Sequence, residues 1–198
     1  SAESAEGGVK LLRRALGELA AAGGLAGLLK LADTFTNITN RLKNVTTSTA
    51  NLNVVTDELF QLANRTRASF EATVSTYARL RKSTESLGLS QKETIDILET
   101  LNQAIVLGGS SPEEGALGLR QLGQGLAGGI LRLEEFNSIA EQTPGILNLL
   151  ADNIPGAGDV GKLRKLGLEG KLTAEVIVTA IQRAGNSLEG RFAETVVT

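Results

Sequence analysis

The sequence predicts an all-α fold, a compact multi-helix domain of about seven to nine short and medium helices joined by turns rich in glycine and proline. Apolar residues recur at helical spacing, and no segment alternates apolar and polar residues over the length of a strand. Aromatic residues make up 3% of the chain and Trp is absent, so Leu, Ile, Val and Ala must form the core. With 41% hydrophobic residues, 198 residues are enough for one such core.

Residues 1–32 are expected to form a glycine-rich amphipathic helix, either part of the domain or an extension of it. One helix face carries Leu12, Leu16, Leu19, Gly23 and Ala26, and the segment also holds Gly17, Gly24 and Gly27. Each helical glycine costs about 1 kcal/mol relative to alanine, so a helix that keeps several usually needs close approach of a neighbour. The segment 33–50 is rich in Thr and Asn, which predicts a broken helix or a linker.

Residues 33–185 are predicted to be the main helical domain, and residues 186–198 a C-terminal tail or the start of another helix. Two apolar stripes differ in phase, which predicts a kink or tight turn over residues 65–69. Ser90 and Glu93 fit a capping box, Ser111 and Glu114 repeat it with proline at the first helical position, and Gly108-Gly109 ends the helix between them. These two stripes comprise Leu52, Val55, Leu59 and Leu62, and then Phe70, Val74, Tyr77 and Leu80; a third stripe, on the helix behind Ser90, comprises Ile95, Leu98, Leu101 and Ile105.

The composition argues against several classes of function. The net charge of −2 lacks the basic excess expected of a nucleic-acid binder. Because Cys and His are absent, disulfides, thiolate chemistry and His-containing metal or catalytic sites are excluded. We therefore expect no enzyme and predict no catalytic, cofactor-binding or metal-binding residues; only a Ser–Lys pair would remain as a catalyst. The absence of Met suggests a segment of a longer protein or a processed product.

Residues 123–128 match the G-x-G-x-x-G string of dinucleotide-binding sites. That string binds a pyrophosphate only between a strand and a helix. Here it follows Leu119 and Leu122 inside a predicted helix. We therefore interpret its glycines as positions without side chains that allow close packing against that helix.

Two pairs of neighbouring carboxylates, Glu113-Glu114 and Glu134-Glu135, are candidates for acid–base chemistry. Adjacent helical residues do not face each other, so neither pair is expected to converge on one substrate atom. We expect the first pair to act at a helix start, and Glu135 to pair with Arg132 or to act at a helix terminus.

The basic residues concentrate between positions 65 and 82, where acidic residues are interleaved with them. A solvated helix face is the expected interpretation; contact with an acidic protein surface or, less readily, with DNA is the alternative. The basic residues are Arg65, Arg67, Arg79, Arg81 and Lys82, and the acidic ones are Glu58, Glu71 and Glu85.

The stretch Leu19–Leu29 is uncharged and carries the G-x-x-x-G spacing at Gly23 and Gly27, a motif of packed membrane helices. It is much shorter than the roughly 20 residues that span a bilayer. We expect a tight helix–helix contact, with membrane interaction as the alternative.

Residues 121–144 combine a glycine-containing helix, a Gly-Gly stop, a short acidic helix and a Thr-Pro restart. This order resembles the N-terminal domain of bacteriophage tail tape measure proteins. The positions that carry the resemblance are Gln121, Leu122, Gln124, Gly129, Leu131, Glu135, Asn137, Ser138, Glu141 and Pro144. Further matching segments are 31–42, 58–67, 77–80, 87–90, 151–152 and 168–173, so the likeness covers roughly residues 30–185. Gly123, Gly128, Leu133 and the connection 153–158 depart from the family pattern.

The resemblance implies a structural protein of the phage tail, in which the tail tube polymerises around a ruler that sets its length. It implies a location in the virion, and in the host cytoplasm during assembly. Expected partners are tail tube, terminator or tail assembly chaperone proteins, or copies of the chain, with no specific nucleic acid and little membrane contact. We expect the glycine-thinned faces at residues 17–27 and 115–129 to support close helical association. The alternatives are a membrane-active module that aids genome passage and a non-viral helical adaptor domain.

Overall fold

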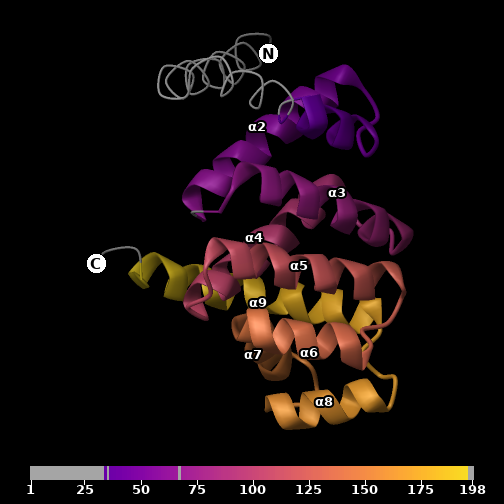
Figure 1. Cartoon of the computed structure of the whole chain (residues 1–198), viewed down its shortest axis with the longest axis vertical. Coiled ribbons are helices and arrows are strands. Elements are labelled where there is room, and N and C mark those ends of the chain that lie inside the picture. The colour runs from indigo at the N-terminus through magenta and orange to yellow at the C-terminus, as the bar shows by residue number, and fades with distance from the viewer. Residues whose placement is uncertain (1–33, 35, 67, 196–198) are drawn as a thin grey trace.

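The computed structural model describes residues 34, 36–66 and 68–195. Within them, residues 36–43 are helical, and eight longer helices follow in order (Figure 1). These are α2 (Thr49–Arg65), α3 (Phe70–Ser86), α4 (Gln91–Leu107), α5 (Pro112–Ala127), α6 (Leu133–Gln142), α7 (Pro144–Asn153), α8 (Val160–Leu168) and α9 (Ala174–Thr195). The predicted all-α class is confirmed. The predicted count of about seven to nine helices is close to the number among the described residues, where the helical segment 36–43 precedes the eight longer helices.

The helices are stacked along the long axis of the molecule (Figure 1). The pair α2 and α3 lies at one end, α4, α5 and α9 form the middle, and α6 and α7 precede α8 at the other end. Helix α3 packs on α4 and α5, α4 packs on α9, and α5 packs on α6. Helix α2 packs chiefly on α3, so it is the outermost of the named helices at its end of the stack.

Side chains at the helix starts explain why the helices begin where they do. The hydroxyls of Ser48, Ser69, Ser90 and Ser111 each accept a hydrogen bond from an amide in the following turn, and the Asp159 carboxylate does the same for α8. Both predicted capping boxes are present, at Ser90 and at Ser111. These contacts satisfy amides that have no partner inside the helix.

The predicted turn over residues 65–69 is also confirmed, since α2 ends at Arg65 and α3 begins at Phe70. The Thr- and Asn-rich segment before α2 is a broken helix, one of the two predicted forms. Its helical residues 36–43 exist despite weak propensity because Ile38 and Leu42 are buried, at 5% and 0% exposure. Burial of two large aliphatic side chains outweighs a propensity deficit of a few tenths of a kcal/mol per residue.

The core is aliphatic, as the composition predicts, and the predicted stripes point into it. All of their members are buried except Phe70, which is partly buried and packs against the core. Tyr77 and Phe136 are the largest of the fully buried side chains.

Helix α9 passes through residues 185 and 186 without a break, and Leu188 and Phe192 beyond that point are buried. The division of the chain at residues 32 and 185 stays a prediction. Residues 1–32, with Gly23, Gly27 and the predicted association face at 17–27, lie outside the described residues.

Candidate functional site

The glycine-rich face of α5 packs against the rest of this chain. A methyl group added at Gly118 would overlap the Thr143 side chain, and one added at Gly125 would lie 2.6 Å from Cδ1 of Leu131. Because Gly118 and Gly125 are buried, these parts of the face at 115–129 serve contacts inside the fold. The opposite side of α5 is exposed and carries Leu117, which is 48% exposed.

The G-x-G-x-x-G string of residues 123–128 lies in the last turns of α5 and at its C-terminal cap. No strand precedes it within the described residues, so the string lacks the strand–turn–helix setting that binds a pyrophosphate. Gly123 and Gly125 are buried within the helix, in agreement with the close-packing interpretation.

A close backbone contact between two glycines joins the end of α4 to the start of α7. A Cβ at Gly145 would overlap the carbonyl oxygen of Ala104, and a Cβ at Gly108 would lie 2.8 Å from Cα of Gly145. Gly108 ends α4, as predicted, whereas no role was predicted for Gly145. The signal was present, since glycine directly after the Thr-Pro helix start is otherwise an unfavourable choice in a first turn.

The candidate carboxylates do not form a catalytic pair. Glu114 caps α5: its carboxylate accepts a hydrogen bond from the Ser111 amide at 2.7 Å, and this bond lowers its pKa. Glu113 and Glu134 are exposed. Glu135 lies in the first turn of α6, which fits the helix-terminus interpretation, and one of its oxygens is buried without a hydrogen-bond partner in the described residues.

The basic residues of α2 and α3 are spread over different surroundings. Arg65 forms a bidentate ion pair with Glu99, in which its Nε and Nη2 donate to the two carboxylate oxygens at 2.6 and 2.7 Å. Arg79 and Lys82, in contrast, are exposed. The Arg81 side chain is only 13% exposed, so it does not belong to a solvated face. Arg67 lies outside the described residues. The members of the group that the structure describes therefore do not present one continuous basic surface.

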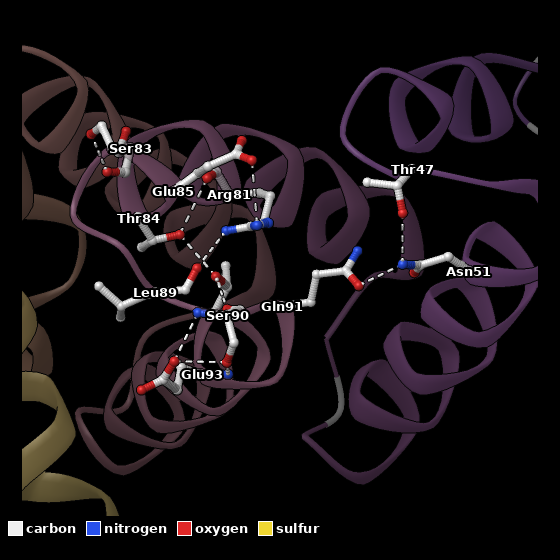
Figure 2. A network of polar contacts seen from close by, with 12 residues as sticks. Thr47, Asn51, Arg81, Ser83, Thr84, Glu85, Leu89, Ser90, Gln91 and Glu93 are labelled. Atoms are coloured by element: carbon white, nitrogen blue, oxygen red, sulfur yellow. Dashed lines mark hydrogen bonds and ion pairs between the residues drawn. The ribbon is translucent and has the colours of Figure 1, made fainter.

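Arg81 belongs instead to a polar junction where α2, α3 and α4 meet (Figure 2). Its Nη1 donates to the carbonyl of Leu89 at 2.8 Å, which fixes the α3–α4 turn. Nearby, Asn51 of α2 donates to Oε1 of Gln91, the first residue of α4, at 2.8 Å. Burial raises the pKa of the Tyr77 hydroxyl beneath this junction, and the charge of Arg81 offsets part of that effect.

Two sequence segments that carry the family resemblance meet in space. The amide of Leu131 donates to the carbonyl of Leu172 at 2.9 Å, and the amide of Ala174 donates to the carbonyl of Gly129, also at 2.9 Å. These bonds flank an antiparallel bridge between Ile130 and Thr173. The α5–α6 connection is thereby joined to the α8–α9 connection, so the resemblance rests on residues that hold the fold together.

Neither metal sites nor membrane-spanning helices are found in the described residues. No cluster of three or more acidic side chains there is arranged to hold a metal ion. None of the helices in this part of the chain combines the length and apolar character needed to cross a bilayer.

Fold and contacts define an all-α structural module whose distinctive glycines and turns join helices to one another. The family model of tape measure proteins matches residues 26–198. The chain therefore belongs to the tape measure protein family, the structural proteins of bacteriophage tails. No curated protein and no solved structure matches it significantly.

Proposed function

We propose that this chain is a folded assembly module of a tape measure protein that sets tail length. The module acts through helical contacts with tail tube, terminator or tail assembly chaperone proteins, or with copies of itself, and it meets them in the host cytoplasm before the tail is complete. The proposal rests on the family match over residues 26–198 together with the way the helices fold back on one another.

The way in which the helices fold back on one another favours a compact module over an extended ruler. Six glycines with positive φ lie in the connections between helices among the described residues. The longest helix there, α9, has 22 residues and is about 33 Å long at 1.5 Å per residue. If residues 34–195 formed one continuous helix, that helix would be about 240 Å long. A chain folded in this way gains little length per residue.

The exposed large apolar side chains on three helices are candidate contact points. Val54 on α2 is 57% exposed, Leu117 on α5 is 48% exposed and Leu168 at the end of α8 is 60% exposed. They lie on separate helices, so a partner that uses them would contact the module at several places.

The test is made in a phage whose tape measure protein contains this segment. One mutant lacks residues 34–195 in frame, and a second keeps the residue number but carries Gly145→Leu, which disrupts the contact of α7 with α4. The proposal predicts that both reduce the number of tails and that any tails formed by the second have normal length, as measured by electron microscopy. Normal numbers of tails shortened by about 240 Å in the deletion mutant would instead make these residues part of the ruler.

A further inference from the structure

Helix α8 presents an exposed aliphatic side chain beside two cations at one end of the stack (Figure 1). Leu168 is 60% exposed, and Arg164 and Lys165, which precede it by four and three residues, are exposed as well. Residues three and four apart lie on the same side of a helix, so we call these three residues the α8 patch. The other lysines at this end, Lys162 and Lys171, already pair with acidic neighbours. The two cations of the patch form no ion pair or side-chain hydrogen bond within the described residues.

Helix α2 presents a patch of the opposite charge at the other end of the stack (Figure 1). Val54 is 57% exposed. Asp57 and Glu58 follow it by three and four residues, the first partly exposed and the second exposed. We call these three residues the α2 patch. Its carboxylates form no ion pair or side-chain hydrogen bond within the described residues, where Arg65 of the same helix is paired with Glu99.

The two patches have opposite orders along the chain. In the α2 patch the charged residues follow the aliphatic one, whereas in the α8 patch they precede it. When two helices pack antiparallel, the direction toward the C-terminus of one is the direction toward the N-terminus of the other. Leu168 therefore meets Val54 in such a pair, and the two cations face the two carboxylates. Burial of the aliphatic side chains and attraction between the charges both favour this arrangement.

We propose that the α8 patch of one copy of this chain binds the α2 patch of a second copy, with the two helices antiparallel. Within one copy the patches stay apart, because α2 packs chiefly on α3 and α8 packs on α6 and α7, at opposite ends of the stack (Figure 1). A contact between two different surfaces leaves both patches of a pair available for further copies, so the copies form a row or a closed ring. The inference rests on the assembly role proposed above and names one of its partners.

The size of the contact predicts that it is weak by itself. Helix α8 has nine residues and is about 13 Å long. A contact of that length buries much less than the roughly 1,200 Å² of total surface at which stable interfaces begin. We therefore expect a monomer at micromolar concentration and association near about 1 mM. Added salt should weaken the association, because it screens the exposed charges.

Reversal of the charges of one patch at a time tests the contact. A first variant carries Arg164→Glu and Lys165→Glu, so that both of its patches are acidic. A second variant carries Asp57→Lys and Glu58→Lys, so that both of its patches are basic. Light scattering should show each variant alone to be monomeric up to about 2 mM, where the mass of the parent chain has risen. An equal mixture of the two should associate again, because each α8 patch then finds an α2 patch of opposite charge in the other variant.

A matched control separates the contact from the effect of net charge. Arg120→Glu with Arg183→Glu makes the same change in net charge at exposed positions of α5 and α9, in the middle of the stack (Figure 1). This control should associate as the parent chain does, and all variants should keep the circular dichroism of the helices. A parent chain that stays monomeric up to about 2 mM, a mixture that does not associate, or a control that loses association would overturn the proposal.

The phage separates a second copy from a different occupant of the two patches. Each reversed variant should reduce the number of tails, and production of both in one cell should restore it. Reduced tail numbers that joint production does not restore would mean that another tail protein binds the patches, and the contact between copies would be refuted. The assembly role itself would still be decided by the Gly145→Leu and deletion mutants.

Discussion

The amide of Leu131 donates a hydrogen bond to the carbonyl of Leu172 at 2.9 Å, across 41 positions of sequence. Together with the bond from Ala174 to Gly129, it connects the turn after α5 to the turn before α9. Gly129 makes this turn possible because its φ is +78°. Residues other than glycine rarely adopt this region of backbone conformation. The turn is therefore a point where one substitution should loosen two distant parts of the fold.

Gly129→Ala should lower the free energy of unfolding by about 1–2 kcal/mol, because alanine is strained at positive φ. Its neighbour Gly128 has φ of −77°, and a Cβ there would meet only ordinary contacts at 3.5 Å. Gly128→Ala should accordingly be neutral or stabilising by up to about 1 kcal/mol. Urea denaturation of both variants checks the pair; equal destabilisation by both would show that the turn does not depend on backbone conformation at Gly129.

Gly145→Ala should destabilise the fold by about 2–3 kcal/mol, because the added methyl overlaps backbone atoms of α4 that cannot move independently. Gly190 is the control, since it lies in α9 with no atom near an added Cβ. Gly190→Ala should raise stability by about 0.5–1 kcal/mol. The thermal midpoints of the two variants should move in opposite directions, and a Gly145→Ala midpoint at or above that of the parent chain would contradict the backbone contact.

The ion pair between Arg65 and Glu99 should contribute little to stability. The side chains are 48% and 25% exposed, and exposed pairs contribute about 0.2–1 kcal/mol. A double-mutant cycle with Arg65→Ala and Glu99→Ala should give a coupling energy in this range that decreases as salt is added. A coupling energy well above that range, unchanged by salt, would mean that the pair holds α2 far more firmly than its exposure implies.

The capping box at α4 should make stability depend on acid pH. Hydrogen bonds from the Ser90 hydroxyl and amide lower the pKa of Glu93 below its ordinary 4.5. A depressed pKa in the folded state stabilises the fold above the unfolded-state value, and this contribution is lost as the pH falls through the folded-state value. Glu93→Gln should therefore lower stability most near pH 7 and least below pH 4.5. Chemical denaturation at several pH values checks this; a difference independent of pH would exclude the linkage.

Much of the fold could be predicted because its signals are local. The capping serines, the glycine stops and the apolar stripes each act within one or two turns of helix, and most stand where the sequence places them. The association face proposed for α5 was different. Its glycines contact Thr143 and Leu131, and no local pattern indicates whether a thinned helix face meets its own chain or a partner.

The same limit explains which contacts between helices were missed. The contact of Gly145 with Ala104 joins residues 41 positions apart. Arg81 was assigned to a solvated face because the charges around it alternate in sign. Its burial follows from the α3–α4 turn, whose carbonyl at Leu89 it binds. Such features depend on which helices meet, and periodicity does not contain that information.

Mass and shape measured together on the purified chain test most directly whether it is a folded module. Light scattering gives the mass of the particle and small-angle X-ray scattering its radius of gyration. A compact monomer of 198 residues should have a radius of gyration near 16 Å, and about this value is what the account predicts. A rod approaching about 300 Å in length would contradict it and would make these residues part of the ruler.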